Sequence, residues 1–551
     1  MHYELTLYQK FEQHVRTETT IDTLAELWDC SSRHAKTQIQ ALHQQQVVQW
    51  ETLRGRGKKP FITLLRDKID VLTDTMQALW KKSKYEEAIQ LAQEMELLTH
   101  PQIQRWLNVQ FGLQIENDIH VFRQVMYYVE LCLDPLKALS RHDMHILEQI
   151  HESLFSIDEK GNTSGNLLFH VHTDDFQQWQ FILRKGILFH NLQEVTASDV
   201  VVSLLRAAPF YTQSFQFVKV EEIDRYEIHI TLAQPCSLLP HFLASTRFAI
   251  VPASGESHIG CGAFTLTEHN DVGIKLQTFN HYFKQRPWID VVEIVYSNQF
   301  QVDTIRYEPF NDPSIPNRKI MSQEQGAEYV ALNGRYGALK DEQKRAYIWH
   351  LIQQEAYIVD PSSETIAHSW MMDSEPIQLS KLKQNPIFTQ PLTIGFQQIR
   401  EGVSHEHKAK ILQEQLAKEG IQSTLQCINF KEKLVDLNRQ IDVFVGGIAL
   451  GNNVFASLIS IYLAQPQMIL NFLEPANAEY VCARLQAVTE QNVNMAIFKE
   501  IEQFIQTNYT VKFLTHRQHI FYVREDTSYK HVQFDQHGRI DYRRMYLSKG
   551  K

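Results

Sequence analysis

The chain has 551 residues, of which 43% are hydrophobic and 21% are charged. This length predicts several domains, and this composition excludes extended disorder. The apolar runs fall far short of the roughly 20 residues that a membrane-spanning helix needs, so we expect no membrane partner. The net charge of −10 argues against nucleic-acid binding by the chain as a whole, but residues 30–66 contain seven Arg and Lys side chains against a single acid, Glu51. This segment alone can attract phosphate.

Three helices are predicted before residue 45. Leu7, Phe11 and Val15 recur every four residues, which predicts a first helix across this stretch. Thr20 is a favourable N-cap for a second helix that begins directly after it. A third helix is predicted over residues 32–44, where apolar side chains at helical spacing leave the basic side chains on the outward face.

A basic hairpin follows the three helices. Residues 47–52 and 61–64 are predicted strands, and the loop 53–60 between them contains two glycines and four Arg or Lys residues. Three helices followed by a hairpin are typical of a winged helix-turn-helix, so residues 1–66 are predicted to bind double-stranded DNA, with the third helix in the major groove. A three-helix protein-interaction module with a solvated hairpin is the alternative. The predicted DNA-contacting residues are Ser31, Ser32, Arg33, Lys36, Thr37, Gln40, Arg54, Arg56, Lys58 and Lys59.

Residues 67–118 are predicted to form amphipathic helices that connect this N-terminal head to the rest of the chain. No Gly-, Ser- or Pro-rich stretch interrupts them, so the joint is predicted to be stiff. Two interpretations stay open: these helices transmit a conformational change, or they only pack against one neighbour.

From residue 119 to residue 551, predicted strands alternate with predicted helices. Two α/β units are recognisable, one near residues 179–205 and one over residues 392–446. Two such units predict two lobes, and small solutes bind preferentially between units of this kind, although the sequence identifies no ligand-contacting residue. The predicted lobe boundaries are about 119–330 with 510–551 for lobe I and about 331–509 for lobe II.

Six stretches carry recognisable motifs: Trp179 to His190, Ala197 to Val200, Gly260 to Phe264, Phe279 to Tyr282, Val330 to Asn333 and Leu416 to Ile421. Together they resemble the family 5 extracellular solute-binding proteins, which are the oligopeptide, nickel and dipeptide receptors of ABC importers. The resemblance implies a two-lobed α/β fold of the type II periplasmic-binding-protein class. Because this scaffold accepts very different ligands, the fold cannot name the solute.

Further matches lie at Ser31 to His34, Gly55 to Lys58 and Gly538 to Tyr542. A winged helix joined by helices to a solute-binding domain resembles the SgrR family of bacterial transcriptional regulators. The resemblance implies a transcription factor that reads a small metabolite, and the expected solute is a sugar, a sugar phosphate or a short peptide. The secreted relatives carry a lipoprotein cysteine, whereas acidic residues precede Cys30 here, so a cytoplasmic protein is expected.

The other chemistry-bearing residues are interpreted as structural. The pairs His142/His145 and His405/His407 lack the His-Glu pairing of a zinc helix, and the six cysteines form no CxxC pair, so neither a metal nor a disulfide is expected. No GxSxG, Walker A or GxGxxG motif occurs, so neither an enzyme nor a cofactor is expected. The aromatic residues interpreted as core or hinge residues are Trp288, Tyr336 and Trp370.

The sequence as a whole predicts a one-component transcriptional regulator in which solute-driven closure of the two lobes controls the winged helix. Its expected partners are double-stranded DNA and a small solute, with a second copy of the chain and RNA polymerase as further candidates. The alternative is a cytoplasmic solute- or peptide-binding protein whose N-terminal module contacts protein. A salt-dependent gel shift distinguishes the two, because only the regulator binds DNA electrostatically.

Overall fold

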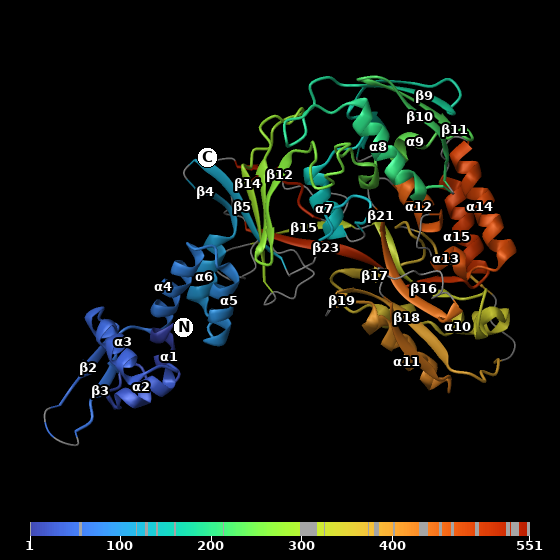
Figure 1. Ribbon diagram of the computed structural model, residues 1–551. Helices are drawn as coiled ribbons and strands as arrows, with labels where there is room; N and C mark the ends of the chain where they lie inside the picture. Colours follow the sequence, from blue (N-terminus) through green and yellow to red (C-terminus); the bar gives the residue numbers. More distant parts are fainter. Residues whose placement is uncertain are drawn as a thin grey trace.

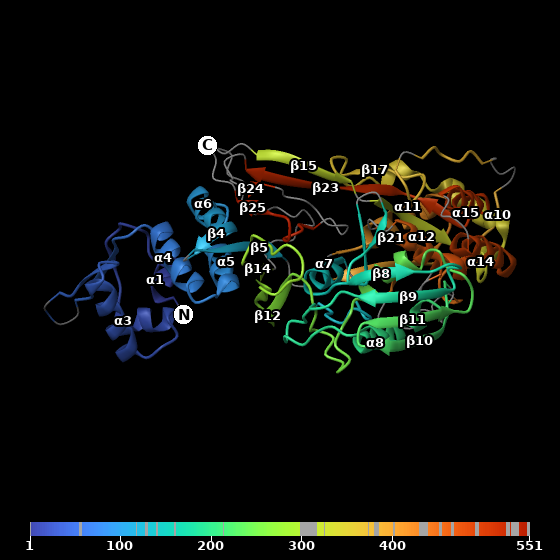
Figure 2. The ribbon, with the colours of Figure 1, turned by 90° about the horizontal axis from the view of Figure 1, so that it is seen from above.

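A small head lies at one end of the computed structural model and a large two-lobed part lies at the other (Figure 1). The connector helices lie between them, as the view from above also shows (Figure 2). The structure describes the whole chain except residues 1, 54, 56–57, 117, 127–130, 139–140, 159–160, 213, 298–316, 324, 373, 380–384, 401–402, 429–438, 451–453, 464–467, 491–494, 525–528, 531–538 and 548–551.

The elements of the head are α1 Tyr3–Leu7, β1 Thr17–Glu18, α2 Ile21–Leu27, α3 Ser32–Gln44, β2 Val48–Glu51 and β3 Phe61–Leu64. The hydroxyl of Thr20 caps α2 by accepting a hydrogen bond from the backbone N–H of Thr23 at 3.1 Å. The strands follow the order β1-β3-β2, and together with the helices they enclose an apolar core. The predicted winged-helix arrangement is therefore confirmed.

The first helix differs from the prediction. It ends at Leu7, and His14 has a φ of 60°, a left-handed conformation through which a helix cannot continue. The chain turns back there and adds β1 to the hairpin. Phe11 is buried in the turn, but Val15 is 43% exposed, so the spacing of four residues did not mark one helical face.

Three helices form the connector: α4 Lys68–Trp80, α5 Tyr85–Glu94 and α6 Pro101–Gln110. Trp80 lies at their centre, with its ring centroid 4.7 Å from that of Tyr85, 5.3 Å from Trp106 and 5.5 Å from Phe111. The buried side chains of the head and of the connector belong to one apolar cluster. The head is therefore packed onto the connector.

The two larger sheets in the described part of lobe I have the strand orders β12-β13-β14-β5-β4 and β10-β11-β9-β8, and β6 pairs with β7 in a small separate sheet. The connector enters the first sheet through β4, which pairs antiparallel with β5, so the predicted boundary after residue 118 falls inside this hairpin. The elements are β4 Gly112–Glu116, β5 Ile119–Met126, α7 Arg141–Ile150, β6 Phe155–Ile157, β7 Thr163–Gly165, β8 Leu168–His172, β9 Gln178–Leu183, α8 Ala197–Ala207, β10 Phe217–Asp224, β11 Glu227–Leu232, α9 Leu239–Leu243, β12 Phe264–Asn270, β13 Gly273–Thr278 and β14 Val291–Tyr296.

Lobe II is built on a sheet with the order β19-β18-β21-β16-β22, in which β20 also pairs with β18. Because β18 is parallel to β20 and to β21, and α11 lies between β18 and β20 in the chain, the α/β unit predicted over residues 392–446 is confirmed. The elements are β16 Gln325–Leu332, α10 Glu342–Leu351, β18 Leu392–Arg400, β19 Val403–Ser404, α11 Glu406–Lys418, β20 Ser423–Ile428, β21 Val443–Leu450, α12 Val454–Leu463, α13 Met468–Phe472, α14 Pro475–Glu490, α15 Met495–Thr507 and β22 Val511–Phe513.

Two strands link the lobes. β15 (Asn317–Gln323) leads into β16, β23 (Thr515–Arg524) follows β22, and the two pair antiparallel with each other. A short strand, β17 (Glu364–Ile366), pairs with the beginning of β23. Because β16 and β22 both belong to the lobe II sheet, lobe II begins a few residues before 331 and ends a few residues after 509.

The C-terminal segment returns to lobe I. Ile540, Tyr542 and Met545 are buried against apolar side chains of its first sheet, and the Tyr542 hydroxyl accepts a hydrogen bond from Gln124 Nε2 at 2.6 Å. The last two strands, β24 Tyr529–Lys530 and β25 Tyr546–Leu547, pair with each other. Among the helices that the structure describes, none is long and apolar enough to cross a membrane.

Candidate nucleic-acid interface and solute-binding module

The outward face of α3 is polar and contains no acidic side chain. Ala35, Ile39 and Leu42 point into the head, where none is more than 4% exposed. A helix turns by 100° per residue, so the opposite face presents the polar side chains to solvent. Its exposed residues include Arg33, Lys36, Thr37 and Gln40.

Hydrogen bonds within the head occupy three of the predicted contact residues. The hydroxyl of Ser31 accepts from a backbone N–H in the first turn at 3.3 Å and so caps α3, while Ser32 donates to Asp22 Oδ1 at 2.7 Å. The hydroxyl of Thr37 donates at 3.1 Å to a backbone oxygen one turn earlier. The hydroxyls of Ser31 and Thr37 bond backbone groups of α3, and that of Ser32 links α3 to α2. Among the predicted contact residues of α3, the exposed side chains for which the structure describes no such bond are Arg33, Lys36 and Gln40.

The predicted wing is described only in part. Lys58 and Lys59 are exposed between β2 and β3, whereas Arg54 and Arg56 lie outside the described residues. Lys59 Nζ is 3.2 Å from Glu18 Oε1 on β1. Lys59 is thus paired with a carboxylate of the head itself.

Arg16 is a basic residue of the head that the sequence prediction missed. Its guanidinium lies 3.6 Å from the ring centroid of Phe61 and donates to Glu51 Oε2 at 2.8 and 3.0 Å. Since Glu51 is the single acid of the basic segment 30–66, this pair neutralises the one charge there that opposes phosphate binding. Arg16 lies upstream of that segment, so only the sheet pairing brings it close.

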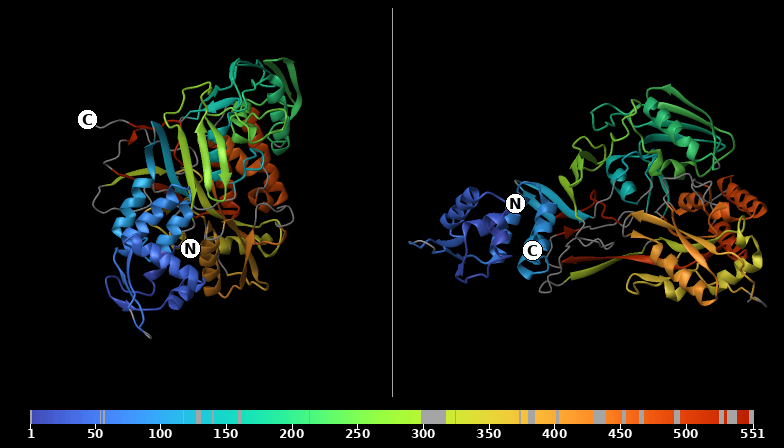
Figure 3. Two further views of the ribbon diagram at one scale, coloured as in Figure 1. Left: turned by 60° about the vertical axis from the view of Figure 1, so that its left-hand side comes forward. Right: turned by 60° about the horizontal axis from the view of Figure 1, so that its bottom comes forward.

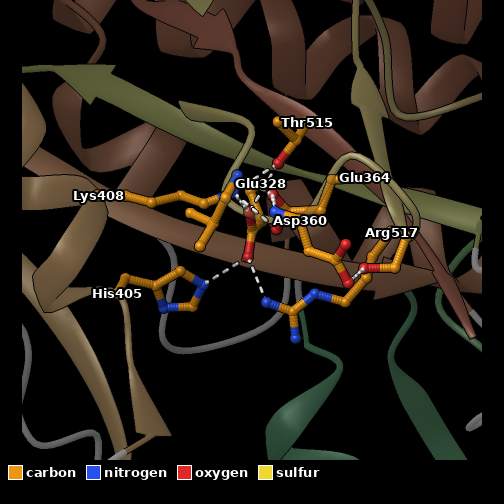
Figure 4. A network of polar contacts seen from close by, with 9 residues as sticks. Glu328, Asp360, Glu364, His405, Lys408, Thr515 and Arg517 are labelled. Carbon is orange, nitrogen blue, oxygen red and sulfur yellow. Dashed lines mark hydrogen bonds and ion pairs between the residues drawn. The ribbon is translucent and has the colours of Figure 1, made fainter. Parts of the chain in front are cut away.

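A buried polar cluster lies where β23 leaves lobe II (Figure 4). Lys408 of α11 donates to Glu328 of β16, to Glu364 of β17 at 3.2 Å and to the hydroxyl of Thr515 at 2.7 Å. Thr515 in turn donates to Glu328 at 2.7 Å, and Arg517 donates to the same carboxylate at 3.1 Å. The cluster thus joins one helix and three strands from two sheets.

The carboxylate of Glu328 stays charged inside this cluster. Burial alone raises its pKa, but the hydrogen bond from His405 and the charges of Arg517 and Lys408 outweigh burial and hold the pKa well below its usual value. The side chain of Arg517 is 34% exposed, whereas those of Glu328 and Lys408 are 10% and 6% exposed. Buried pairs of this kind add little net stability, but removing one partner is costly because a charge is left uncompensated.

The histidine pairs singled out in the sequence lie in structural surroundings. Arg539 of the C-terminal segment donates to the ring of His142 at 3.0 Å, and the ring of His145 contacts that of Tyr542 with centroids 5.2 Å apart. His405 belongs to the Glu328 cluster. Across the described parts of the chain, no group of three His, Cys, Asp or Glu side chains is placed to hold a metal ion, and none of the six cysteines is in a disulfide.

The three aromatic residues interpreted as core or hinge residues differ in their surroundings. Trp370 is completely buried, with two aromatic rings 4.8 and 5.2 Å from it, so its interpretation as a core residue is confirmed. For Trp288 the interpretation is wrong: the side chain is 53% exposed, because it lies in the loop before β14, beside the ring of His120. Tyr336 is half-buried in a turn with two guanidinium groups 5.7 and 5.8 Å from its ring centroid.

These features define a class of protein in which a winged-helix head is joined by helices to a two-lobed solute-binding domain. Family models match both parts of the chain. The model described as sugar transport-related sRNA regulator N-term matches residues 2–114, and that described as bacterial extracellular solute-binding proteins, family 5 middle, matches residues 167–358. The chain therefore resembles an SgrR-like fusion, with an N-terminal part similar to the regulator family and a second part similar to the family 5 solute-binding proteins.

Relatives of known name extend this comparison. The HTH-type transcriptional regulator SgrR of Yersinia enterocolitica is 30% identical over 54% of this chain and 56% of its own length. The SgrR protein of Pectobacterium atrosepticum is 28% identical over 55% of this chain and 57% of its own length, so the chain spans a little over half the length of these relatives. The uncharacterized protein YhjP of Bacillus subtilis (strain 168) is 24% identical over 97% of this chain and 96% of its own length.

Solved structures confirm the fold class of the second domain. The oligopeptide-binding protein AppA of Bacillus subtilis, in complex with a nonapeptide, has a TM-score of 0.62 at 17% identity and covers 78% of this chain and 100% of its own. NikA of Brucella suis, in complex with Fe(III)-EDTA, has a TM-score of 0.62 at 17% identity and covers 77% of this chain and 100% of its own. At this identity the likeness establishes the two-lobed α/β fold and nothing about the ligand.

Proposed function

We propose that this protein is a DNA-binding transcriptional regulator whose activity is controlled by a small solute. The observation that carries the proposal is the exposed, acid-free face of α3 in a winged-helix head that is fused to a solute-binding fold. In this proposal Arg33 and Gln40 contact base edges in the major groove, because Arg suits guanine and Gln suits adenine. Lys36 and the wing residues Arg54, Arg56, Lys58 and Lys59 contact phosphates, which position the head without reading sequence.

The solute binds between the lobes in this proposal. AppA and NikA were solved with a nonapeptide and with Fe(III)-EDTA, so one scaffold accepts chemically different ligands. For this chain we propose a sugar, a sugar phosphate or a short peptide, bound in the cytoplasm and without a catalytic step. The signal then requires that the solute favour one lobe arrangement, since a ligand with equal affinity for both arrangements shifts no equilibrium.

DNA binding is the part to test first. Fragments that the full-length protein retains from sheared genomic DNA identify its site, and fluorescence anisotropy then measures the affinity of each variant for that site. Arg33→Ala is expected to cost about 1–3 kcal/mol on the preferred sequence and to relax the preference. Lys418→Ala is the matched control, because it removes an exposed charge of lobe II, far from the head.

The wing has its own test. The triple variant Arg56→Ala, Lys58→Ala, Lys59→Ala is expected to weaken binding to all DNA sequences alike, because phosphate contacts carry no sequence information. If the triple variant and Arg33→Ala both bind DNA like the unmodified protein, the head is better explained as a protein-interaction module. The chain would then be a solute- or peptide-binding protein rather than a regulator.

A further inference from the structure

The head, the connector and the first sheet of lobe I form one packed body. The apolar cluster that fills the head and the connector extends to Val295 of β14 and to Val125 of β5. Arg123 of β5 is 5% exposed beside it, 2.6 Å from Glu293 of β14 and 3.2 Å from Glu116 of β4. Arg123 also donates to the backbone oxygen of Gln110, the last residue of α6, at 3.1 Å, so apolar contacts and this hydrogen bond fix the connector to lobe I. A movement between the lobes then leaves the head in place on lobe I.

A two-stranded ribbon joins this body to lobe II. β15 and β23 pair antiparallel from Gln323 and Gln518, close to the lobe II sheet, to Asn317 and Arg524 at the other end. At about 3.3 Å per residue, β23 spans roughly 33 Å. The ribbon runs from lobe II toward the end of the molecule that carries the connector, as the views of Figures 1, 2 and 3 agree.

The lobe II end of this ribbon is fastened by three consecutive residues of β23. Thr515 and Arg517, which share one face of the strand, both donate to Glu328 of β16. His516 on the other face bonds the backbone oxygen of Gly326, also on β16, at 2.7 Å. Since β16 directly follows the first crossing between the lobes and β23 begins at the second, these contacts tie the two crossings together.

We propose that the buried Glu328–Lys408–Thr515 cluster is an anchor that makes the β15–β23 ribbon move with lobe II. Rotation of lobe II is then delivered along the ribbon to the connector end of the molecule. Lys408 and Thr515 are positioning residues here, because they act through the ribbon. The inference rests on the proposed function in one respect: binding of the solute is what causes lobe II to rotate.

The anchor is tested on the full-length protein by distances between spin labels, measured by double electron–electron resonance. Labels are attached through a non-natural amino acid, because the thiol of Cys427 is exposed and would react with a cysteine-directed label. The label sites are exposed residues of α11 in lobe II, of β13 in lobe I and of α5 in the connector: Lys418, Gln277 and Gln93. Thr515→Val removes the hydroxyl at constant side-chain shape and is expected to broaden the distance distribution between lobe II and the connector. The distribution between lobe I and the connector is expected to stay unchanged.

Two further variants make the result decisive. Thr507→Val is the matched control, since its exposed hydroxyl lies outside the cluster and donates to a backbone oxygen of its own helix at 2.9 Å. Glu328→Gln keeps the volume but removes the charge that Lys408 and Arg517 contact, so it is expected to broaden the same distribution as Thr515→Val.

Two outcomes overturn the proposal. If Thr515→Val and Glu328→Gln both leave the distance between lobe II and the connector as narrow as Thr507→Val does, the cluster does not anchor the ribbon. If the distance between lobe I and the connector broadens as much, the head and lobe I are not one body. Neither measurement uses DNA or a solute, so a failure of the regulator proposal appears separately, in the DNA-binding assay.

Discussion

Replacing Glu18 with Gln is expected to strengthen DNA binding by the head. Lys59 Nζ lies 3.2 Å from Glu18 Oε1, and the two side chains are 59% and 52% exposed. An exposed pair of this kind contributes only about 0–1 kcal/mol to stability, so the substitution leaves the head folded. It frees one ammonium group for phosphate and removes a negative charge beside the wing.

Counterion release gives the size of this effect. Each neutralised phosphate contributes about −0.9 to the slope of log K against log salt concentration. A head that neutralises about four to six phosphates therefore has a slope of roughly −4 to −5, and Glu18→Gln makes the slope steeper by about 0.9. Lys58 is exposed, and the described part of the chain shows no ion pair for it, so Lys58→Ala makes the slope shallower by about the same amount.

Anisotropy titrations at several salt concentrations between about 50 and 200 mM measure both slopes, and at a slope near −4.5 the affinity falls about 500-fold across this range. The matched control is Glu406→Gln on lobe II, which breaks a Lys–Glu pair of 2.6 Å far from the head. It is expected to leave the slope unchanged. If Glu18→Gln behaves like this control, Lys59 does not contact phosphate and the reasoning about the wing is refuted.

Three other outcomes concern the solute, the connector and pH. A solute at 100 times its dissociation constant is expected to stabilise a fragment of residues 111–551 by about 2.7 kcal/mol in a thermal-shift screen of sugars, sugar phosphates and short peptides. A fragment that starts at residue 119 lacks β4 and is expected to melt at a lower temperature. In the unmodified protein, the solute is expected to change operator affinity roughly 5- to 150-fold. A Gly/Ser insertion at Ser83, in the turn between α4 and α5, is expected to abolish this change. Equilibrium titrations of the variant are still expected to detect binding of the solute and binding of the operator. Burial raises the pKa of Glu502 to about 7, so the folded protein favours the neutral carboxyl group. The stability that this neutral form provides is fully present below the unfolded-state pKa of about 4.3 and is lost as the pH rises through about 7. Glu502→Gln is therefore expected to flatten the dependence of melting temperature on pH between about 5 and 8.

Local signals made the second and third helices of the head predictable. Thr20 caps α2 through a hydrogen bond that spans only three residues, and a cap of this kind is visible in the sequence. The helical spacing of Ala35, Ile39 and Leu42 predicted α3, and all three side chains are buried. The same local reasoning failed between Phe11 and Val15. The helix has already ended at Leu7, His14 has a left-handed conformation, and Gln13 beside it pairs with Leu64 of the distant strand β3.

The motif that contains Gly260 and Gly262 does not by itself explain why these two positions are glycine. The sequence identified them only by resemblance to solute-binding proteins. In the structure, a Cβ at either position would collide with the backbone at Ile150, at the end of α7, so both positions require glycine. The requirement comes from a contact across more than a hundred residues, which no local pattern encodes.

The Glu328 cluster could not be predicted from the sequence either, because it also depends on contacts between distant residues. Its members come from β16, β17, α11 and β23, and each charged residue alone has the pattern of an ordinary solvated side chain. They form a cluster only because the fold brings two carboxylates and two cations into one buried site. Ligand-contacting residues face the same obstacle, because a solute that binds between lobes is held by residues from both.

The fixed attachment of the head to lobe I limits how a solute signal reaches DNA. Val125 and Val295 pack against the connector and Arg123 donates to the backbone oxygen of Gln110 in α6, so lobe closure does not need to deform the head. In the proposed regulator, the part that moves relative to DNA is then lobe II with its ribbon. The insertion at Ser83 loosens the head from this body, whereas Thr515→Val loosens lobe II from the ribbon. If only the insertion abolishes coupling between solute and operator, the signal passes through the orientation of the head. If Thr515→Val abolishes coupling as well, the position of lobe II is itself the signal, and lobe II must then meet the DNA, a second copy of the chain or RNA polymerase.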